Sequence, residues 1–250
     1  MNRTFLIVAA HPDDEVLGCA HELLRHPDRC RVLHSTDGAP FEERFWAQAG
    51  AVSRKAYAKF RREELMRAMD TLDVAPDRVD CLGIPDREAA RQLPVLIEGI
   101  VAYLHQWQPS IIYTHPFEGG HPDHDATAFA VQQACGKVEA IGGVVPERRE
   151  FTSYHAKDGE FHSGDFLSGP GCVQTVELST DEQTRKRAAL NCYRSQQRVI
   201  QRFALTPHRW RLAPSYRFTV RPHDGPLYYE IREMGYQFED FVALVRAAAK

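Results

Sequence analysis

Short apolar runs alternate with amphipathic helical patterns along the first half of the chain. Residues 4–9 form an apolar run that predicts a buried strand, and apolar positions recur at helical spacing directly after it. Further strands are predicted at residues 31–35, 79–82 and 110–114, a polar loop at 37–53, and helices at 14–25, 55–73, 93–107 and 122–135. Because such alternation builds right-handed crossovers, it predicts an α/β fold with a Rossmann-like, mostly parallel sheet flanked by helices.

The second half of the chain is less regular. It predicts strands at residues 152–155 and 173–178, a helix at 180–198 opened by the capping-box pattern Thr180-x-x-Gln183, loops and short strands at 199–236, and a terminal helix at 238–249. A chain of 250 residues with 43% hydrophobic content can bury one sizeable core. We therefore expect a single domain over residues 1–250, with a part at 150–250 that covers the substrate.

Composition narrows the class of protein. The net charge of −3 argues against nucleic-acid binding, which requires a basic surface. The six cysteines form no C-x-x-C pair and are expected to be reduced. The first apolar run is too short for a signal peptide, and no run reaches the roughly 18 residues of a membrane span. A cytoplasmic protein is expected, and its oligomeric state stays open, a homo-oligomer included.

Two polar segments follow predicted strands in the same way. Residues 10–15 read Ala-His-Pro-Asp-Asp-Glu, and residues 119–125 read Gly-Gly-His-Pro-Asp-His-Asp. Each places a His-Pro-Asp between a strand and a helix, with Pro12 and Pro122 suited to the first helical turn. Since both segments are expected at the carboxyl edge of one sheet, their imidazoles and carboxylates can meet around a divalent metal.

These two motifs resemble the signatures of the PIG-L or LmbE-like zinc-dependent N-acetylglucosamine deacetylases, AHPDDE and HPDH. Both stand here without substitution, and the resemblance covers about residues 4–200. Weaker matches are Thr36-Asp37-Gly38, Arg61 with Glu64, and Tyr193-Ser195-Gln196. The resemblance implies an LmbE-like deacetylase fold and a hydrolase that releases acetate from an N-acetylated sugar.

The resemblance also assigns the metal site. Catalytic zinc takes three protein ligands and leaves a position for water, and His11, Asp14 and His124 supply that number. Fe²⁺, Co²⁺ or Mn²⁺ could occupy the same ligands. Asp13 adjoins a ligand and is expected to act as the general base. Glu15 is expected to cap the following helix or to orient its neighbours. His115 is expected to contact the metal ligands without binding the metal.

His121 is expected to stabilise the oxyanion or to act as an acid, as the resemblance implies. Asp123 is expected to keep His121 protonated, since a carboxylate partner raises a histidine pKa. Some relatives carry a tyrosine in the preceding loop as a further donor. Here residues 115–120 contain no hydroxyl group.

Three residues are candidates for contact with the substrate. Arg61 matches a family position that reaches the substrate, although an exposed helix charge is the alternative. Asp37 and Asp86 each follow a predicted strand and could bind a sugar hydroxyl. The family often has an acid after the glycine of Thr36-Asp37-Gly38, where Ala39 stands here.

Residues 185–221 contain ten Arg or Lys, no Asp or Glu, and several aromatic residues. This composition suits an anionic sugar conjugate, a nucleotide-sugar or a phospholipid-linked glycan. The alternative is that the segment packs against acidic elements of the same chain.

The leading interpretation is a zinc-dependent N-deacetylase of an N-acetylglucosamine-type sugar or glycoconjugate. A metal-dependent amidase acting on another N-acyl conjugate in antibiotic or cell-envelope metabolism is an alternative. A sugar- or nucleotide-binding module without catalysis is a third, but the chain has no G-x-G-x-x-G after the first strand, and simple binding does not require Asp13.

Overall fold

The computed structural model describes residues 3–169 and 171–248. Its strands are β1 (Phe5–Ala9), β2 (Cys30–Thr36), β3 (Val79–Ile84), β4 (Ile111–Thr114), β5 (Glu147–Phe151), β6 (Tyr154–Lys157), β7 (Glu160–Ser163), β8 (Gln174–Val176) and β9 (His208–Leu212). Its α-helices are α1 (Asp14–Arg25), α2 (Glu43–Gln48), α3 (Arg54–Thr71), α4 (Leu93–Trp107), α5 (Pro122–Ala140), α6 (Thr180–Cys192), α7 (Gln197–Ile200), α8 (Tyr228–Ile231) and α9 (Phe238–Ala248). None of the described helices is long and apolar enough to cross a bilayer.

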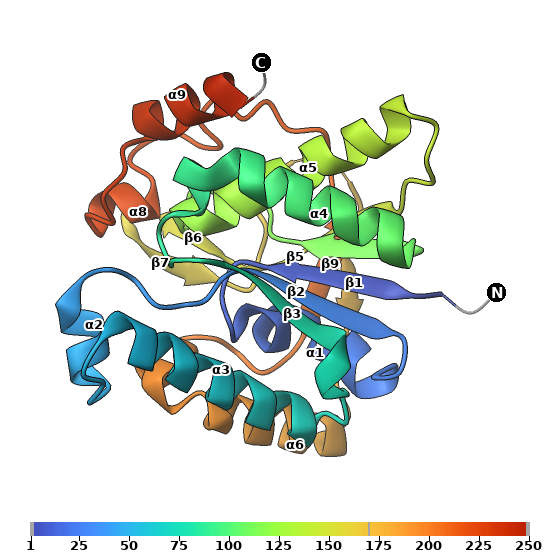
Figure 1. Cartoon of the computed structure of the whole chain (residues 1–250), viewed down its shortest axis with the longest axis vertical. Coiled ribbons are helices and arrows are strands. Elements are labelled where there is room, and N and C mark those ends of the chain that lie inside the picture. The colour runs from blue at the N-terminus through green and yellow to red at the C-terminus, as the bar shows by residue number, and fades with distance from the viewer. Residues whose placement is uncertain (1–2, 170, 249–250) are drawn as a thin grey trace.

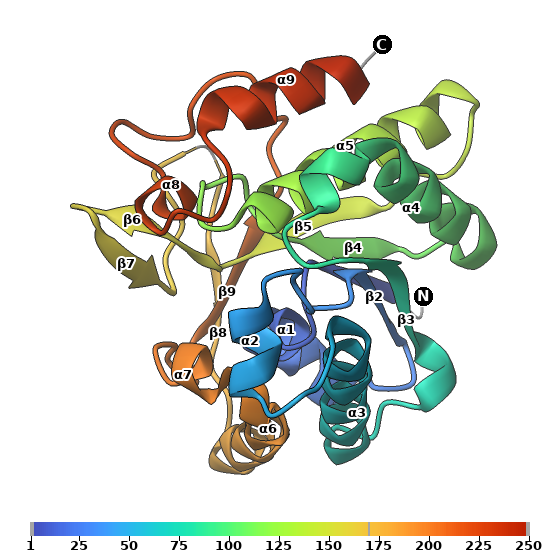
Figure 2. The ribbon, with the colours of Figure 1, turned by 60° about the vertical axis from the view of Figure 1, so that its left-hand side comes forward.

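A seven-stranded sheet in the order β3-β2-β1-β4-β5-β9-β8 forms the middle layer. The strands from β3 to β5 are parallel, and β9 runs antiparallel to both β5 and β8. The expected α/β fold with a mostly parallel sheet is therefore confirmed. Helices α4, α5 and α9 cover one face, while α1, α3 and α6 cover the other (Figures 1 and 2).

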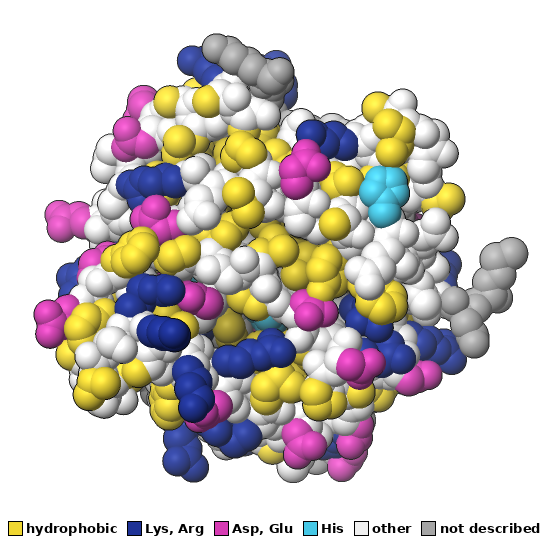
Figure 3. All heavy atoms as spheres, in the orientation of Figure 1, with side chains coloured by type: hydrophobic (Ala, Val, Ile, Leu, Met, Phe, Trp, Pro, Cys, Tyr) yellow, Lys and Arg dark blue, Asp and Glu magenta, His cyan; other side chains and the backbone are white. Residues whose placement is uncertain are grey.

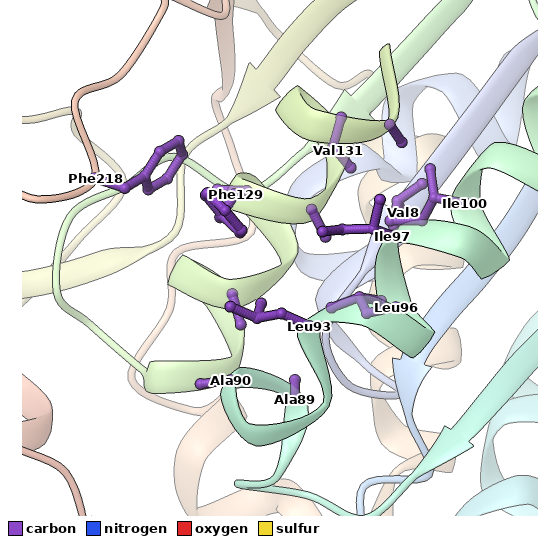
Figure 4. Packing of buried hydrophobic residues seen from close by; sticks show 14 of the residues in the cluster. Val8, Ala89, Ala90, Leu93, Leu96, Ile97, Ile100, Phe129, Val131 and Phe218 are labelled. Atoms are coloured by element: carbon purple, nitrogen blue, oxygen red, sulfur yellow. The ribbon is translucent and has the colours of Figure 1, made fainter. Parts of the chain in front are cut away.

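Alternation along β1 divides the core between the two faces. Leu6 and Val8 pack toward α4 and α5, while Phe5 and Ile7 pack toward α1, α3 and α6. Figure 4 shows the first cluster, in which Val8 meets Ile97 and Ile100 of α4. Because β1 is buried on both faces, its sequence is a continuous apolar run.

Several predicted boundaries differ from those observed. The predicted loop at 37–53 contains α2, and the predicted strand at 152–155 overlaps the gap between β5 and β6. The capping box lies one residue earlier than predicted, because Ser179 and Glu182 exchange the two hydrogen bonds. Pro122 opens α5 as expected, whereas Pro12 lies in the loop before α1. The predicted helix end at Ala249 lies outside the described residues.

Candidate metal centre and surrounding cavity

The two His-Pro-Asp segments leave neighbouring strands at the same edge of the sheet. Strands β1 and β4 are paired in parallel, with Ile7 opposite Tyr113. The strand order reverses between them, since β2 and β3 lie on one side and β5 on the other. Ligands of open α/β sheets bind at such a switch point, outside the carboxyl ends of the strands.

His11, Asp14 and His124 come together at this point. Asp14 Oδ2 lies 3.2 Å from His11 Nδ1 and 3.4 Å from His124 Nε2, and all three side chains are buried. Their candidate ligand atoms lie within 4.8 Å of one another. A second candidate group shares His11 and adds Asp86, His121 and Asp123.

The outer ring nitrogens of the two histidines have partners. His11 Nε2 lies 3.1 Å from Asp123 Oδ2, and His124 Nδ1 lies 3.1 Å from Ser153 Oγ. Histidine ligands of metals typically donate their second N–H to such groups, which fixes the ring and its tautomer. The arrangement leaves His11 Nδ1 and His124 Nε2 facing Asp14.

The charges of the site favour a cation. Burial acts to lower the pKa of His11, but Asp86, Asp123 and Asp14 together raise this pKa well above its ordinary value. The surrounding carboxylates thus favour a positive charge at this position. A divalent ion would supply the same compensation, and two imidazoles with one carboxylate suit Zn²⁺ or a similar ion.

Asp13 occupies a strained backbone position beside this donor set. It is the N-cap residue of α1 with φ of 131°, a region that residues other than glycine seldom adopt. Its side chain makes no capping hydrogen bond and lines the cavity. Burial raises the pKa of Asp13 to about 8, while Arg61, whose Nη2 lies 3.5 Å from Asp13 Oδ2, opposes this shift.

The Glu15 side chain stabilises the turn at Asp13 from the buried side. Its fully buried carboxylate accepts hydrogen bonds from the Asp13 backbone N–H at 2.9 Å, from His34 Nε2 at 2.8 Å, and from the Tyr193 hydroxyl. The interpretation of Glu15 as an orienting residue is consistent with these contacts.

His121 and Asp123 interact differently from the prediction. His121 Nδ1 accepts a hydrogen bond of 3.2 Å from the Asp123 backbone N–H, while the Asp123 carboxylate binds His11 and the backbone N–H groups of Arg87 and Ala89. Burial and the neighbouring His11 lower the pKa of His121 well below its ordinary value. His121 Nδ1 also lies 3.9 Å from Asp123 Oδ2, so the pairing of these two residues stays a prediction, while the direction of the pKa shift opposes a protonated His121. Because Nδ1 accepts this hydrogen bond, a neutral His121 ring would carry its proton on Nε2.

The three predicted substrate contacts have different surroundings. Arg61 is buried and donates to the Pro12 carbonyl at 2.6 Å, so it also holds the loop before Asp13. The Asp37 carboxylate binds Arg54 at 2.7 Å and does not belong to the cavity lining, so its position does not support a substrate contact. Asp86 lines the cavity with Oδ1 3.2 Å from His11 Nε2.

His115 lies behind the donor set. Its Nε2 accepts from the Ala10 N–H at 3.0 Å and lies 3.4 Å from Asp14 Oδ2. The ring stacks on His124 with centroids 3.9 Å apart. His115 does not belong to the cavity lining.

A cavity of about 180 Å³ opens over the donor set. Its floor consists of ionisable residues: His11, Asp13, Asp14, Arg61, Asp86, His121 and His124. Its walls also contain residues that the motifs did not indicate: Leu17, Pro40, Phe45, Tyr57, Arg87, Tyr154, Val199, Phe203 and Met234. Figure 3 shows a histidine at the bottom of a hollow on this face, bordered by hydrophobic and basic side chains.

The segment at 185–221 reaches the cavity through Gln196, Val199 and Phe203, and none of its arginines belongs to the lining. Four of these arginines form ion pairs with acidic residues of the chain: Arg185 with Asp73, Arg209 with Asp165, Arg211 with Glu150, and Arg221 with Glu230. The expected arginine contacts to an anionic substrate are therefore not supported. Packing against acidic residues of the chain accounts for these four side chains.

Comparisons with known proteins agree with the geometry. A family described as GlcNAc-PI de-N-acetylase matches residues 6–135. The chain is 31% identical over 163 residues to a 1D-myo-inositol 2-acetamido-2-deoxy-alpha-D-glucopyranoside deacetylase of Nocardia farcinica, covering 57% of this chain and 55% of that relative. It is 27% identical over 161 residues to a probable N-acetyl-alpha-D-glucosaminyl L-malate deacetylase 2 of Bacillus anthracis, covering 61% and 65%. The match thus spans less than two thirds of these relatives.

A solved structure supports the fold over a longer stretch. The deacetylase–teicoplanin complex from the biosynthesis pathway of teicoplanin superimposes with a TM-score of 0.64 at 19% identity. The superposition covers 85% of this chain and 99% of that one. At this identity the likeness concerns the fold alone.

Proposed function

Because the chain belongs to the GlcNAc-PI de-N-acetylase (PIG-L) family, we propose that it is a zinc-dependent hydrolase that removes the N-acetyl group from an N-acetylglucosamine conjugate. The observation that carries the proposal is the position of Asp13. This carboxylate lies in the cavity beside Asp14 and is free of capping contacts, as a general base requires. The named activities of the two curated relatives support the choice of an N-acetylated sugar.

His11, Asp14 and His124 would hold the ion. When bound there, a divalent ion would acidify a water ligand and polarise the amide carbonyl. Asp86, although close to His11, is assigned to the substrate side of the cavity, where it could accept a hydrogen bond from a sugar hydroxyl. The outer contacts of His11 and His124, which orient their rings toward Asp14, favour this choice of ligands.

Asp13 would take a proton from the attacking water. The unusually high pKa that burial gives this carboxylate makes it a stronger base once it is ionised. The same proton would then pass from Asp13 to the departing sugar nitrogen, so that acetate and a free amine leave. His121, with its proton on Nε2, would donate a hydrogen bond to the carbonyl oxygen as negative charge develops there.

Metal dependence of acetate release tests the proposal. The protein is stripped with a chelator, reloaded with zinc, and supplied with the inositol and malate α-glycosides of N-acetylglucosamine and with the methyl glycoside. Acetate released only after reloading is the expected result. Zinc-loaded protein that releases no acetate from any of these compounds would contradict the proposal.

A further inference from the structure

The cavity changes character from its floor to its walls. The floor is ionisable, but the walls carry six apolar side chains from separate segments: Leu17, Pro40, Phe45, Val199, Phe203 and Met234. Val199 of α7 is 42% exposed, so its side chain is accessible at the wall. The remaining part of a substrate whose acetamido group reaches the floor would meet these apolar side chains together with Tyr57, Arg87, Tyr154 and Gln196.

The two arginines of the lining are already engaged by the chain. Arg61 Nη2 donates to the Pro12 carbonyl at 2.6 Å, and Arg61 also faces Asp13. Arg87 Nη1 lies 2.7 Å from Glu42 Oε1, and its guanidinium stacks over Phe45 at 4.6 Å from the ring centre. A carboxylate or phosphate on the substrate would meet each of these guanidiniums beside a carboxylate of the chain, Asp13 or Glu42, which weakens the attraction for an anion.

The aromatic part of the wall is held in place by neighbouring rings. The Phe203 ring lies 5.9 Å from Tyr154 and 5.4 Å from Phe161, and these two rings lie 5.0 Å apart. Tyr154 in turn packs edge-on against His124, at 5.2 Å. An apolar surface therefore continues from a candidate metal ligand to the outer wall and is formed before a substrate binds.

We infer that the N-acetylated sugar carries an uncharged, apolar aglycone, which lies against Phe45, Val199 and Phe203. This inference rests on the proposed function for the acetamido end of the substrate. It differs from the polyol and dicarboxylate aglycones in the names of the two curated relatives. Burial of alkyl or aromatic surface against the wall supplies binding free energy that a polar aglycone would not gain.

A series of glycosides tests the inference. The methyl, butyl and hexyl α-glycosides of N-acetylglucosamine are compared with the inositol and malate conjugates, using zinc-loaded protein. From methyl to hexyl, kcat/KM is expected to rise by about tenfold or more, since each buried methylene adds to the affinity. A flat series, or a preference for the malate or inositol conjugate, would overturn the inference.

Two matched substitutions test whether the gain from methyl to hexyl glycoside arises at Val199. Val199→Asn should reduce the gain from methyl to hexyl by about fivefold, because it makes part of the wall polar. Val173→Asn is the control, since Val173 is 41% exposed and lies outside the cavity lining. An equal effect of both substitutions, or none from Val199→Asn, would contradict the assigned wall.

Calorimetric binding separates this inference from the proposed function. Hexyl α-glucosaminide, which has no acetyl group, should bind more tightly than methyl α-glucosaminide, and Val199→Asn should remove that difference. This comparison requires no turnover. If no glycoside is hydrolysed, the proposed function fails, while equal affinities for the two glucosaminides would overturn the inference alone.

Discussion

Glu15 Oε2 accepts a hydrogen bond of 2.9 Å from the backbone N–H of Asp13. This contact holds a residue with φ of 131°, so the strained backbone and the buried acid are coupled. The motif residue beside the candidate base thus has a physical role of its own. It directs the Asp13 side chain into the cavity instead of onto the end of helix α1.

Glu15→Ala should destabilise the protein strongly. It leaves three buried donors without an acceptor, on Asp13, His34 and Tyr193, and we expect a loss of about 3 kcal/mol or more in the free energy of unfolding. Tyr193→Phe removes one of these hydrogen bonds and should cost about 1 kcal/mol. Urea unfolding measures both. A Glu15→Ala protein as stable as Tyr193→Phe would show that Glu15 does not organise the turn.

Two substitutions distinguish the candidate donor groups. Asp14→Asn should abolish tight zinc binding, whereas Asp86→Asn should retain it, because only Asp14 lies within reach of both His11 Nδ1 and His124 Nε2. Zinc content after dialysis, measured by elemental analysis, gives the answer without reference to activity. Retention by Asp14→Asn with loss in Asp86→Asn would move the metal to the second group.

Ser153→Ala should weaken metal binding while leaving the ligands in place. The Ser153 hydroxyl is the partner of His124 Nδ1, and loss of such a partner typically lowers metal affinity by about tenfold. Competition with a chromophoric chelator measures the change. Ser163→Ala, on strand β7 and outside the cavity lining, is the control and should match the wild type.

The buried side chain of Lys186 should make the free energy of unfolding depend on pH. Its ammonium has three uncharged partners, the carbonyls of Leu17 and Leu205 and the ring of His208, and burial lowers the pKa of Lys186 to about 7. The unfolded chain, with the ordinary pKa of 10.5, binds more protons between about pH 7 and 10, so stability rises with pH in this window. The stability that the folded protein gains from keeping Lys186 uncharged is fully present above the pKa of the unfolded chain, and it is lost as the pH falls to the folded pKa of about 7.

The comparison of wild type with Lys186→Met isolates this lysine. The difference in the free energy of unfolding should grow between pH 7.5 and 9 by up to about 1.4 kcal/mol per pH unit in favour of the wild type. Urea unfolding at several pH values measures it. A difference that stays constant with pH would mean that Lys186 is charged in the folded protein.

Periodicity predicted much of the sheet and its helices because these elements bury continuous or regularly spaced apolar positions. The run at 4–9 and the helix at 14–25 correspond closely to β1 and α1. Helix α2 was missed because it is short and buries no residue, so its sequence carries no periodic signal. Strand β5 was missed because its sequence, Glu-Arg-Arg-Glu-Phe, is mostly charged. In the folded protein one of these charges is neutralised by an ion pair between Glu150 and Arg211 of strand β9.

The candidate metal centre was predictable because its residues lie in two compact motifs. Ser153, Phe45 and Phe203 were not, because they reach the site through tertiary packing and belong to no local pattern. The further contacts of Asp123 were not predictable for a related reason. Sequence proximity to His121 suggested a pairing, but the first turn of α5 directs the Asp123 carboxylate toward His11 and the backbone at Arg87 and Ala89.

The central claim is that Asp13 is the general base. The most direct test compares the rate of acetate release from the N-acetylglucosamine glycosides by Asp13→Asn with that by the wild type at equal zinc content. Loss of the proposed general base should lower kcat by about two orders of magnitude or more, while the proposed ligands His11, Asp14 and His124 are unchanged. A variant that retains its zinc and releases acetate at the wild-type rate would contradict the assignment of Asp13 and the mechanism built on it.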